Sequence, residues 1–248
     1  MALRRFRADL HIHSCLSPCG ELSIYPRKIV ERALEEGLEI IAVTDHNTAE
    51  NAAAVLRAAE GTGLTVFPGM ELTSEEEVHV LGLFETMEEV LRVQDEVFRK
   101  LPETEANAPF IKDQVIVNEG DEVTGFSRRF LIAATTMNVF EVVELIHRNG
   151  GLAIASHVDR ESFSLFSQLG FIPPGLALDA LEVSSWRSRE RARQVIIADD
   201  SLPLVRFSDA HRPEEIGRAW TEFRMAAKTW DELRLAIKGS GGRTVCRS

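Results

Sequence analysis

The chain has 248 residues, a length that fits one large domain or two small ones. Hydrophobic residues make up 44% and charged residues 27% of it, and its 28 basic and 39 acidic residues give a formal charge of −11. The excess of negative charge argues against broad electrostatic docking on nucleic acid or an anionic membrane. A small phosphorylated substrate stays compatible with it, because bound divalent cations would reverse the sign of the charge inside a pocket.

The chain has three cysteines, Cys15, Cys19 and Cys246, an odd number that does not indicate a disulfide scaffold. We therefore expect reduced thiols and a cytoplasmic protein. The first residues contain no long apolar run after their basic residues, so no signal peptide is expected. No stretch approaches the roughly 18 apolar residues of a membrane span, so we expect no contact with a membrane.

Short apolar runs typical of buried strands alternate with amphipathic stretches typical of helices along most of the chain. In chain order the pattern predicts a strand at residues 6–12, a helix at 26–36, a strand at 38–44, a helix at 48–60, strands at 64–68 and 78–84, a helix at 138–148, strands at 152–156 and 179–183, a helix at 187–198, strands at 203–207 and 220–225, and a helix at 230–238. This alternation predicts an α/β fold with a parallel sheet.

Residues 85–130 interrupt the alternation. Residues 85–101 form an amphipathic helical stretch, residues 102–109 are polar and predicted to be a loop, and residues 118–125 are acidic and rich in turn formers. We interpret residues 85–130 as an insertion near the active-site mouth of a single domain that spans residues 1–248. The insertion is a candidate lid or substrate-selecting element.

Histidines and carboxylates follow or end the predicted strands. His11 and His13 end the first strand, Asp45 and His46 follow the second, and Glu71 follows the third. His157 and the segment Asp209-Ala210-His211 repeat the pattern later in the chain. Residues from the carboxyl ends of many strands converge only if the sheet closes. The sequence therefore favours a barrel over an open sheet.

Two histidine-containing pairs have the spacing of residues that share one face of a strand. His11 and His13 are two positions apart, as are Asp209 and His211, so each pair can hold one metal ion. A pair of exposed polar residues at the start of a loop is the alternative for either pair alone. Two such pairs, each after an apolar run, favour metal binding.

The remaining candidates are weaker when each is considered alone. Glu71 could bridge two metal ions or be a solvated glutamate, and His79 and His157 could be ligands or satisfied core histidines. Asp45 and His46 are adjacent and would face opposite ways on a strand. We expect His46 to be the ligand and Asp45 to orient an imidazole or a metal-bound water.

Together these residues resemble the PHP (polymerase and histidinol phosphatase) superfamily of metal-dependent phosphoesterases. The segments that match, in the order of the family, are Asp9-Leu10-His11-Ile12-His13-Ser14, Thr44-Asp45-His46, Pro68-Gly69-Met70-Glu71, His79-Val80-Leu81-Gly82, the strand into His157, and Ser208-Asp209-Ala210-His211. The resemblance implies a distorted (β/α)7 barrel with two or three divalent metal ions, zinc, iron or manganese, at its mouth.

The resemblance also implies the ligand sets. His11, His13, Glu71 and Asp209 would hold one ion, Glu71, His79 and His157 a second, and His46 and His211 a third. Members of the family often carry an acidic residue shortly after the second histidine, whereas here Cys19 lies near that position. Cys19 is therefore either a thiolate ligand or a structural cysteine. Asp45, His46 and Glu71 are the residues expected to act in catalysis.

Arginines are the candidates for holding a phosphate group. Arg129 matches an arginine of relatives that act on nucleotides, but Leu131 stands where those relatives have a histidine. Arg160 lies three residues after His157, and Arg212 directly follows His211. An exposed arginine in an ion pair is the alternative for each of them.

The residues predict hydrolysis of a phosphate ester by a metal-activated water, without a protein nucleophile. We expect a small phosphorylated substrate, such as a phosphomonoester, a nucleotide or a short oligonucleotide, and no long duplex nucleic acid. The alternatives are an exonuclease or other module that processes nucleic-acid ends, and a non-catalytic metal-binding scaffold.

Overall fold

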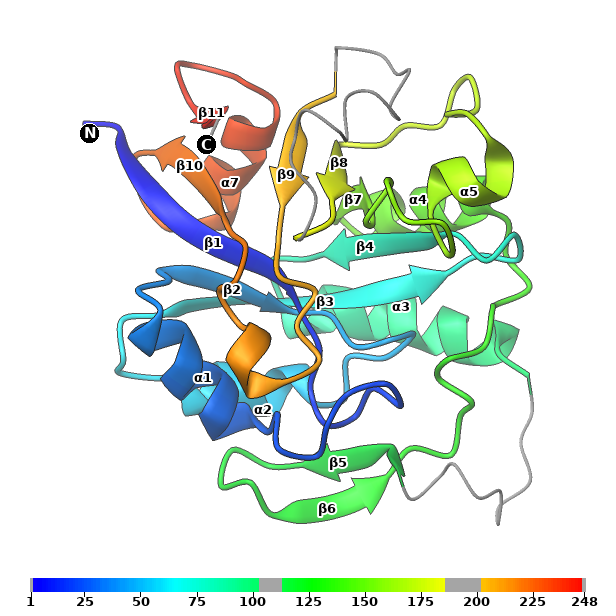
Figure 1. Ribbon diagram of the computed structural model, residues 1–248, viewed down its shortest axis with the longest axis horizontal. Coiled ribbons are helices and arrows are strands. Elements are labelled where there is room, and N and C mark those ends of the chain that lie inside the picture. The colour runs from blue at the N-terminus through cyan, green and yellow to red at the C-terminus, as the bar shows by residue number, and fades with distance from the viewer. Residues whose placement is uncertain (1, 103–112, 186–201, 247–248) are drawn as a thin grey trace.

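A computed structural model describes residues 2–102, 113–185 and 202–246 of the chain. Seven strands follow one another around a nearly closed, barrel-like sheet (Figure 1). They are β1 (Arg4–Ile12), β2 (Ile40–Val43), β3 (Thr65–Thr73), β4 (His79–Leu83), β7 (Leu152–Ala155), β8 (Ala180–Val183) and β9 (Leu204–Arg206). β10 (Thr221–Met225) and β11 (Thr244–Val245) extend the sheet beyond β1. The predicted α/β barrel is confirmed.

The segment after β9 returns to β1 and brings the two ends of the barrel together. Ala210 forms a parallel bridge with Ile12, and the backbone N–H of His13 donates to the carbonyl of Ala210 (2.9 Å). The buried carboxylate of Asp9 accepts hydrogen bonds from the backbone N–H groups of Ser208 and Gly217, both at 3.0 Å. Polar contacts of β1 therefore position the segment that carries Asp209 and His211.

The sequence had predicted a parallel sheet, but the observed sheet is mixed. β4 is antiparallel to both β3 and β7, whereas the β1–β2, β2–β3, β7–β8 and β8–β9 pairs are parallel. Only a short connection joins β3 to β4, and a parallel crossover would need a dozen or more residues. The two strands therefore form a hairpin.

β3 continues through Pro68 and Gly69, where the sequence had predicted its end. Pro68 has no backbone N–H to donate, but its carbonyl accepts a hydrogen bond from the N–H of Phe84 (3.0 Å). A Cβ atom at Gly69 would lie 2.7 Å from Cγ2 of Thr44, so glycine allows β2 and β3 to approach closely. Glu71 consequently lies inside β3 rather than after it.

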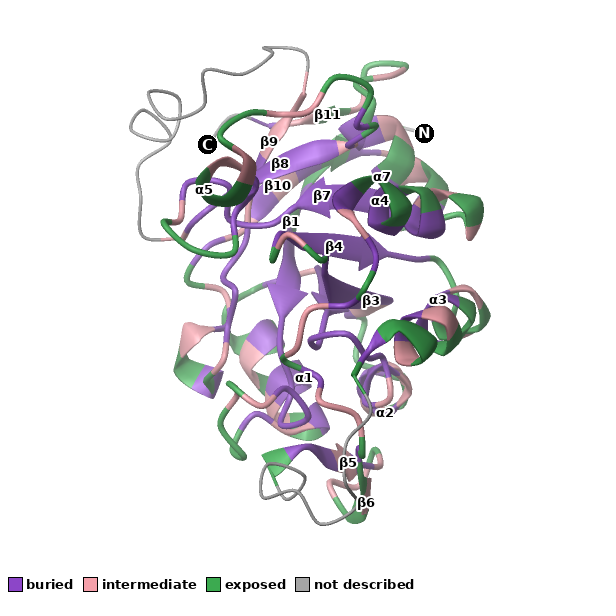
Figure 2. Ribbon diagram, turned by 90° about the vertical axis from the view of Figure 1, so that its right-hand side faces the viewer, coloured by how far each residue is buried: buried purple, intermediate pink, exposed green. Residues whose placement is uncertain are grey.

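Helices cover the outside of the barrel (Figures 1 and 2). α1 (Pro26–Glu35), α2 (Ala52–Ala58), α3 (Met87–Lys100) and α4 (Val139–Arg148) contribute buried apolar residues to the core between helices and sheet. α3 and α4 each begin with a capping box, Thr86 with Glu89 and Asn138 with Glu141. α5 (Leu165–Leu169) was not predicted, and the helix predicted at 187–198 lies outside the described residues.

The inside of the barrel holds a second apolar core. It consists of side chains from β1, β2, β3, β4, β7, β8, β9 and β10 together with α7 (Trp230–Ile237). The rings of Trp230 and Phe67 meet edge to face at a centroid distance of 5.4 Å. This apolar packing fills the barrel interior on the side of α7. The polar side chains inside the barrel lie at the other end. In the part of the chain that the structure describes, no helix is both long and apolar enough to cross a membrane.

Residues 85–130 contain α3 and a separate two-stranded hairpin of β5 (Val115–Val117) and β6 (Val123–Phe126). The sequence had indicated turns in this part and no strands. Asn51 fastens the hairpin to the barrel, because its amide donates to the carbonyl of Val115 (3.1 Å) and its Oδ1 accepts from the N–H of Val117 (3.0 Å). The same amide donates to Oγ of Ser14 (3.0 Å), beside the end of β1.

Candidate metal centre

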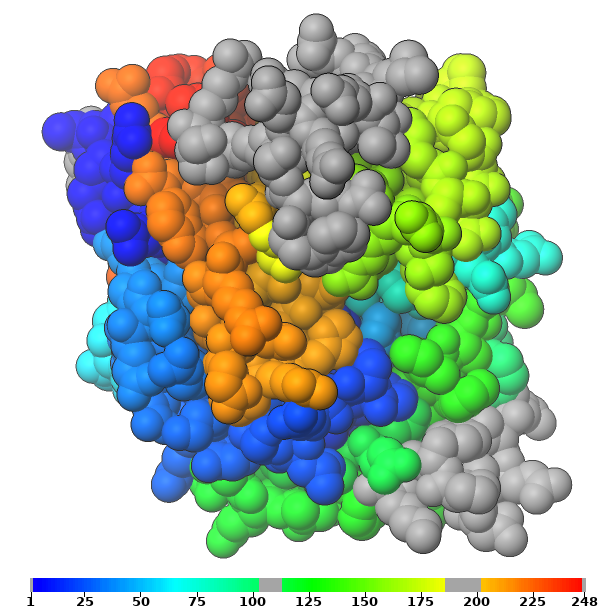
Figure 3. All heavy atoms as spheres, viewed as in Figure 1, coloured from blue at the N-terminus to red at the C-terminus, as the bar shows by residue number. Residues whose placement is uncertain are grey.

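Histidines and carboxylates from six places in the chain meet at the end of the barrel where β1 ends. The cluster consists of His11, His13, His46, Glu71, His79, His157 and Asp209, all buried. His79 begins β4, and because β4 is antiparallel its first residue lies at the same end as the last residues of its neighbours. The space-filling view is hollowed where the blue segment after β1, the orange segment after β9 and the green segments meet (Figure 3).

A register shift in β1 turns its two histidines toward the cluster. Phe6, Ala8 and Leu10 alternate toward the inner core, whereas Ile12 belongs to the outer core. The pairing of β1 with β2 shifts between Asp9 and Ile12, so the side facing the interior changes there. Bulges of this kind re-aim side chains next to functional sites. His11 and His13 therefore share the interior face, although the strand's earlier alternation would point them outward.

The carboxylate of Glu71 is the point at which the histidines converge. Each of its oxygens faces a different set of imidazole nitrogens, all within 3.5 Å. Oε1 lies 3.1 Å from Nδ1 of His79, 3.3 Å from Nε2 of His157 and 3.4 Å from Nε2 of His11, while Oε2 lies 3.2 Å from Nδ1 of His46 and 3.5 Å from Nε2 of His13. This arrangement suits a carboxylate that bridges two cations.

The hydrogen-bond network leaves lone pairs facing one another. Nδ1 of His11 lies 2.9 Å from a carboxylate oxygen of Glu182, so it carries the proton and Nε2 is left as an acceptor. Nδ1 of His13 contacts Oγ of Ser17 (3.0 Å), whose own proton goes to Asp45, which leaves Nε2 of His13 as an acceptor too. These two Nε2 atoms are 3.2 Å apart, and each is 3.2 Å from Oδ1 of Asp209.

Acceptors that face one another at such distances repel unless a cation lies between them. Buried atoms without a hydrogen-bond partner among the described residues point to the same conclusion. They include Oε1 of Glu71, Nδ1 of His46 and Nδ1 of His79. A buried polar group left unpaired is costly, and a bound metal ion would satisfy all of these atoms. The donor set of imidazole and carboxylate fits divalent ions such as zinc, iron or manganese.

The environment of Glu71, His13 and His46 favours the protonation states that metal binding requires. Burial alone would raise the pKa of Glu71, but the surrounding imidazoles of His79, His11 and His46 outweigh it and hold that pKa well below its usual value. Burial, together with the positive charges of neighbouring histidines, lowers the pKa of His13 to about 4 and that of His46 well below its ordinary value. Glu71 is thus ionised and His13 and His46 are neutral, as ligands must be. Burial lowers the pKa of His11, but the charges of Glu182, Asp209 and Glu71 outweigh it and raise that pKa well above its usual value, so an ion bound there would displace a proton.

Two further buried carboxylates fix the orientation of histidines of the cluster. Glu182 contacts His11 and also accepts a hydrogen bond from the backbone N–H of His157 (3.1 Å). Asp45 accepts from Oγ of Ser17 (2.6 Å) and from both the N–H and Oγ of Ser14 (2.7 Å each), and it thereby reaches His13 through Ser17. Sequence reasoning singled out Asp45 but missed Glu182, whose signal was a carboxylate inside the apolar strand β8.

A third group of donors lies beside the first two. Single ligand atoms of His13, Cys19, His46 and His211 all lie within 4.8 Å of one another. The groups His11–His13–Glu71 and His46–Glu71–His79 meet the same criterion. Cys19 therefore stands close to the histidines with which a thiolate could share an ion. His147 lies apart from the cluster and contacts Asp179 (2.8 Å).

The arginines differ in their relation to the cluster. Arg160 contacts Oδ2 of Asp209 directly, so the structure brings it to the centre. Arg129 lies over the ring of Phe98 of α3, 5.5 Å from its centroid, and Arg212 pairs with the exposed Glu21 (2.9 Å). The structure therefore brings Arg160 to the centre, whereas the contacts of Arg129 and Arg212 lie elsewhere.

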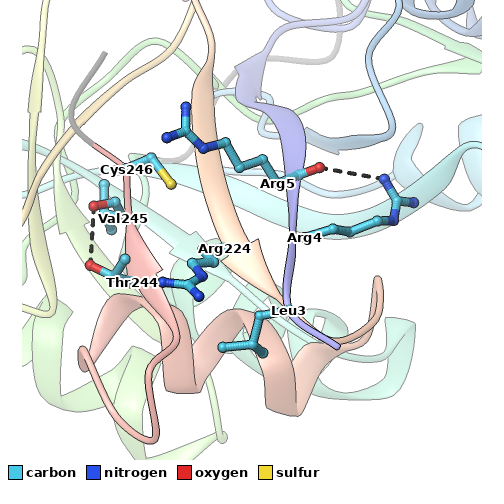
Figure 4. A pocket seen from close by; sticks show the side chains of 7 residues that line it. All are labelled: Leu3, Arg4, Arg5, Arg224, Thr244, Val245 and Cys246. Carbon is cyan, nitrogen blue, oxygen red and sulfur yellow. Dashed lines mark hydrogen bonds between the residues drawn. The ribbon is translucent and has the colours of Figure 1, made fainter. Parts of the chain in front are cut away.

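A surface groove of about 530 Å³ lies at the other end of β1 (Figure 4). It is lined by Leu3, Arg4, Arg5, Arg224, Thr244, Val245 and Cys246. None of these residues belongs to the donor cluster. The chemistry indicated by the cluster is therefore separate from this groove.

Known protein families match the parts of the chain that carry the donor cluster. The family model described as PHP domain matches residues 9–169, and the model described as PHP-associated matches residues 189–240. The 5'-3' exoribonuclease Rnm of Salmonella typhimurium is 27% identical over 201 residues, which cover 63% of this chain and 67% of that protein. The PHP domain match contains His11, His13, His46, Glu71, His79 and His157, and the PHP-associated match contains Asp209.

Solved structures with the same fold include endonuclease Q of Pyrococcus furiosus, with a TM-score of 0.78 and 23% identity. A second structure, endonuclease Q in complex with a 27-mer duplex that carries an abasic lesion at the active site, has a TM-score of 0.74 and 21% identity. Each match covers 98% of this chain and 58% of the endonuclease Q chain, so this chain spans little more than half of that protein.

These relatives overturn the expectation of a small phosphorylated partner and no long duplex nucleic acid. Rnm is named for action on RNA, and one endonuclease Q structure holds a 27-mer duplex. The expectation rested on the formal charge of −11, which sums over the whole surface. A nucleic acid meets only one face, where bound cations and a few arginines determine the local charge.

Proposed function

This chain belongs to the PHP domain family of metal-dependent hydrolases, and from that premise we propose that it hydrolyses phosphodiester bonds in nucleic acid, at strand ends or at lesions. The observation that carries the proposal is the convergence of buried imidazoles on the two oxygens of Glu71. The relationship to Rnm and the fold shared with endonuclease Q support nucleic acid as the substrate class.

We propose three ion-binding groups, each with donors from several segments of the chain. His11, His13, Glu71 and Asp209 would form the first, Glu71, His46, His79 and His157 the second, and His13, His46, His211 and Cys19 the third. Bound divalent ions would neutralise phosphate oxygens and lower the pKa of a coordinated water to about 7.

The residues around the ions have separate tasks in this proposal. Glu71 holds a negative charge between two groups, and His46 completes the contact with its second oxygen. Asp45 acts through Ser17 to keep the proton of His13 on Nδ1. Arg160 lies beside Asp209 and offers a guanidinium to a phosphate oxygen of the strand.

We also propose that residues 85–130 form an insertion beside the mouth of one domain. Asn51 supports this placement, because its side chain contacts both the β5–β6 hairpin and Ser14, and Ser14 in turn donates to Asp45. A chain of three hydrogen bonds, through Asn51 and Ser14, therefore links the hairpin to Asp45 of the proposed catalytic set. A role in substrate selection follows from this position.

The test is cleavage of a panel of end-labelled nucleic acids: single-stranded RNA, single-stranded DNA, and duplex DNA with and without an abasic site. We expect metal-dependent products from at least one of them, lost on chelation and lost in the variant His11→Ala. His147→Ala is the matched control, because His147 lies outside the cluster, and it should cleave like the unmodified protein. No cleavage with any divalent metal, or cleavage that survives His11→Ala, would contradict the proposal.

A further inference from the structure

An aromatic ring borders the donor cluster without belonging to it. The ring of Phe163 stacks on the imidazole of His79, with a centroid distance of 4.9 Å and an interplanar angle of 22°. Phe163 nevertheless remains 43% exposed. One face of the ring lies against His79, so the exposed part is the other face and the edge.

The backbone of Phe163 is held in an unusual conformation. Its φ of +56° is in the left-handed region, which bulky side chains rarely adopt. His157 and Asp209 of the cluster, and Asn47 next to His46, also have positive φ values, of 28°, 51° and 53°. Such strain persists only where the surrounding structure enforces it, and it concentrates at functional sites.

Hydrogen bonds enforce the conformation from both sides. The carbonyl of Phe163 accepts from the backbone N–H of His79 (3.1 Å). The next residue, Ser164, caps α5 by accepting from the N–H of Ser167 (3.1 Å), and its hydroxyl donates to the carbonyl of Arg160 (2.7 Å). Burial of the ring does not offset the strain, because much of the ring stays in solvent. The arrangement therefore presents the ring rather than hides it.

The same short segment presents two kinds of group to the mouth. Arg160, three residues before Phe163, contacts Asp209 at the centre, while Phe163 stacks on His79 at its edge. A guanidinium and an aromatic face together match the two parts of a nucleotide, the phosphate and the base. Aromatic side chains bind bases of any sequence, because every base has a π face.

We propose that Phe163 is a stacking platform for one nucleobase of the substrate strand, next to the phosphate that is cleaved. This inference rests on the proposed function and adds a base contact to it. Phe163 is a positioning residue for the strand, and the contact should be tolerant of base identity. Loss of the base, in contrast, should weaken binding.

The test combines substrate and protein changes. A cleavable oligonucleotide is made in versions that each lack one base, and KM is measured for every version. For the unmodified protein, one position near the cleaved bond should raise KM by roughly 5- to 150-fold, the range of a single base–aromatic stack. In Phe163→Leu, which keeps an apolar cover on His79, the complete oligonucleotide should already have the raised KM, and removing that base should change it no further.

Two further variants separate stacking from structure. Phe163→Trp keeps a π face and should restore the dependence on the base. Phe171→Leu makes the same change at another exposed phenylalanine, 58% exposed, and should leave every KM unchanged. Metal content is measured in parallel and should be the same in all variants.

Two results would overturn the inference alone: cleavage whose KM depends on no single base, or the same dependence in Phe163→Leu as in the unmodified protein. Absence of cleavage of any nucleic acid by the unmodified protein would instead remove the proposed function, and the base contact with it. The two failures are therefore distinguishable.

Discussion

Replacing Glu182 with glutamine should weaken the binding of one metal ion and leave the others unchanged. Glu182 contacts Nδ1 of His11 with both oxygens, at 2.9 and 3.1 Å, and accepts the backbone N–H of His157 at 3.1 Å. The negative charge of Glu182 holds the proton of His11 on Nδ1, which leaves Nε2 free to bind an ion. The substitution removes this buried charge. The amide keeps the size of the side chain.

Outer partners of ligating histidines typically change metal affinity by 10- to 100-fold, so we expect a loss of about 1.4–2.7 kcal/mol in the binding of the ion at His11 and His13. Competition with a chromophoric chelator measures each binding step. His46 and His79 do not contact Glu182 in the described structure, and the carbonyl oxygen of glutamine can still accept the backbone N–H of His157, so the affinity of the group that contains these three histidines should not change.

Glu232→Gln is the matched control, because it makes the same chemical change on α7, away from the cluster, and should not alter metal affinity. If Glu182→Gln bound every ion as tightly as the unmodified protein does, the orientation of His11 by Glu182 would have no energetic role. An equal loss in every binding step would also contradict the reasoning, because it would indicate a general loss of structure.

Four more outcomes follow from the structure. Glu71→Gln should lower the metal content by at least two ions per chain in elemental analysis and abolish cleavage, because both carboxylate oxygens face imidazoles. Chelation should lower the unfolding free energy by about 2.7 kcal/mol relative to protein with free ion at about 100 times Kd, and thus lower Tm by roughly 5–10 °C in calorimetry. Gly69→Ala should destabilise the protein by about 1–3 kcal/mol in urea unfolding, because the new Cβ would lie 2.7 Å from a neighbouring side chain, whereas at Gly125 the nearest atom is 3.9 Å away and alanine should be tolerated. The hydrogen bonds from Arg243 lower the pKa of Glu232 to about 2, so the stability difference between the unmodified protein and Glu232→Gln should be constant above about pH 4.5 and vanish as the pH falls toward 2.

The sequence predicted the donor cluster because ligand spacing is a local property. His11 and His13 are two residues apart in an extended segment, and so they share a face whichever way the strand turns. The direction of that face was not predictable, because it depends on the register shift between β1 and β2. The pairing of strands distant in sequence decided it.

Glu182 shows a signal that was present and overlooked. Alone among the four residues of β8 it is charged, and it is buried. A charge in such a strand needs a buried partner, so the sequence already implied a contact like that with His11. Arg129 is the opposite case: its position in the sequence suggested a substrate contact, but the fold places it over Phe98.

Pro68 and Gly69 misled the prediction of β3 for a physical reason. Both residues usually end a strand, but here the hydrogen bonds and the close approach of β2 and β4 favour them. The substrate class was misjudged from net charge, which carries no information about which face of the molecule is acidic. Short sequence patterns therefore predicted which residues form the donor cluster, whereas the net charge did not predict the class of substrate.

Anomalous diffraction at the absorption edge of the bound metal tests the central claim most directly. Crystals of the protein as purified, and crystals soaked with manganese or zinc, should show at least two ions that share the carboxylate of Glu71, with His11 and His13 on one side and His79 on the other. A cluster that binds no ion under these conditions, or ions bound only at places remote from Glu71, would contradict the account.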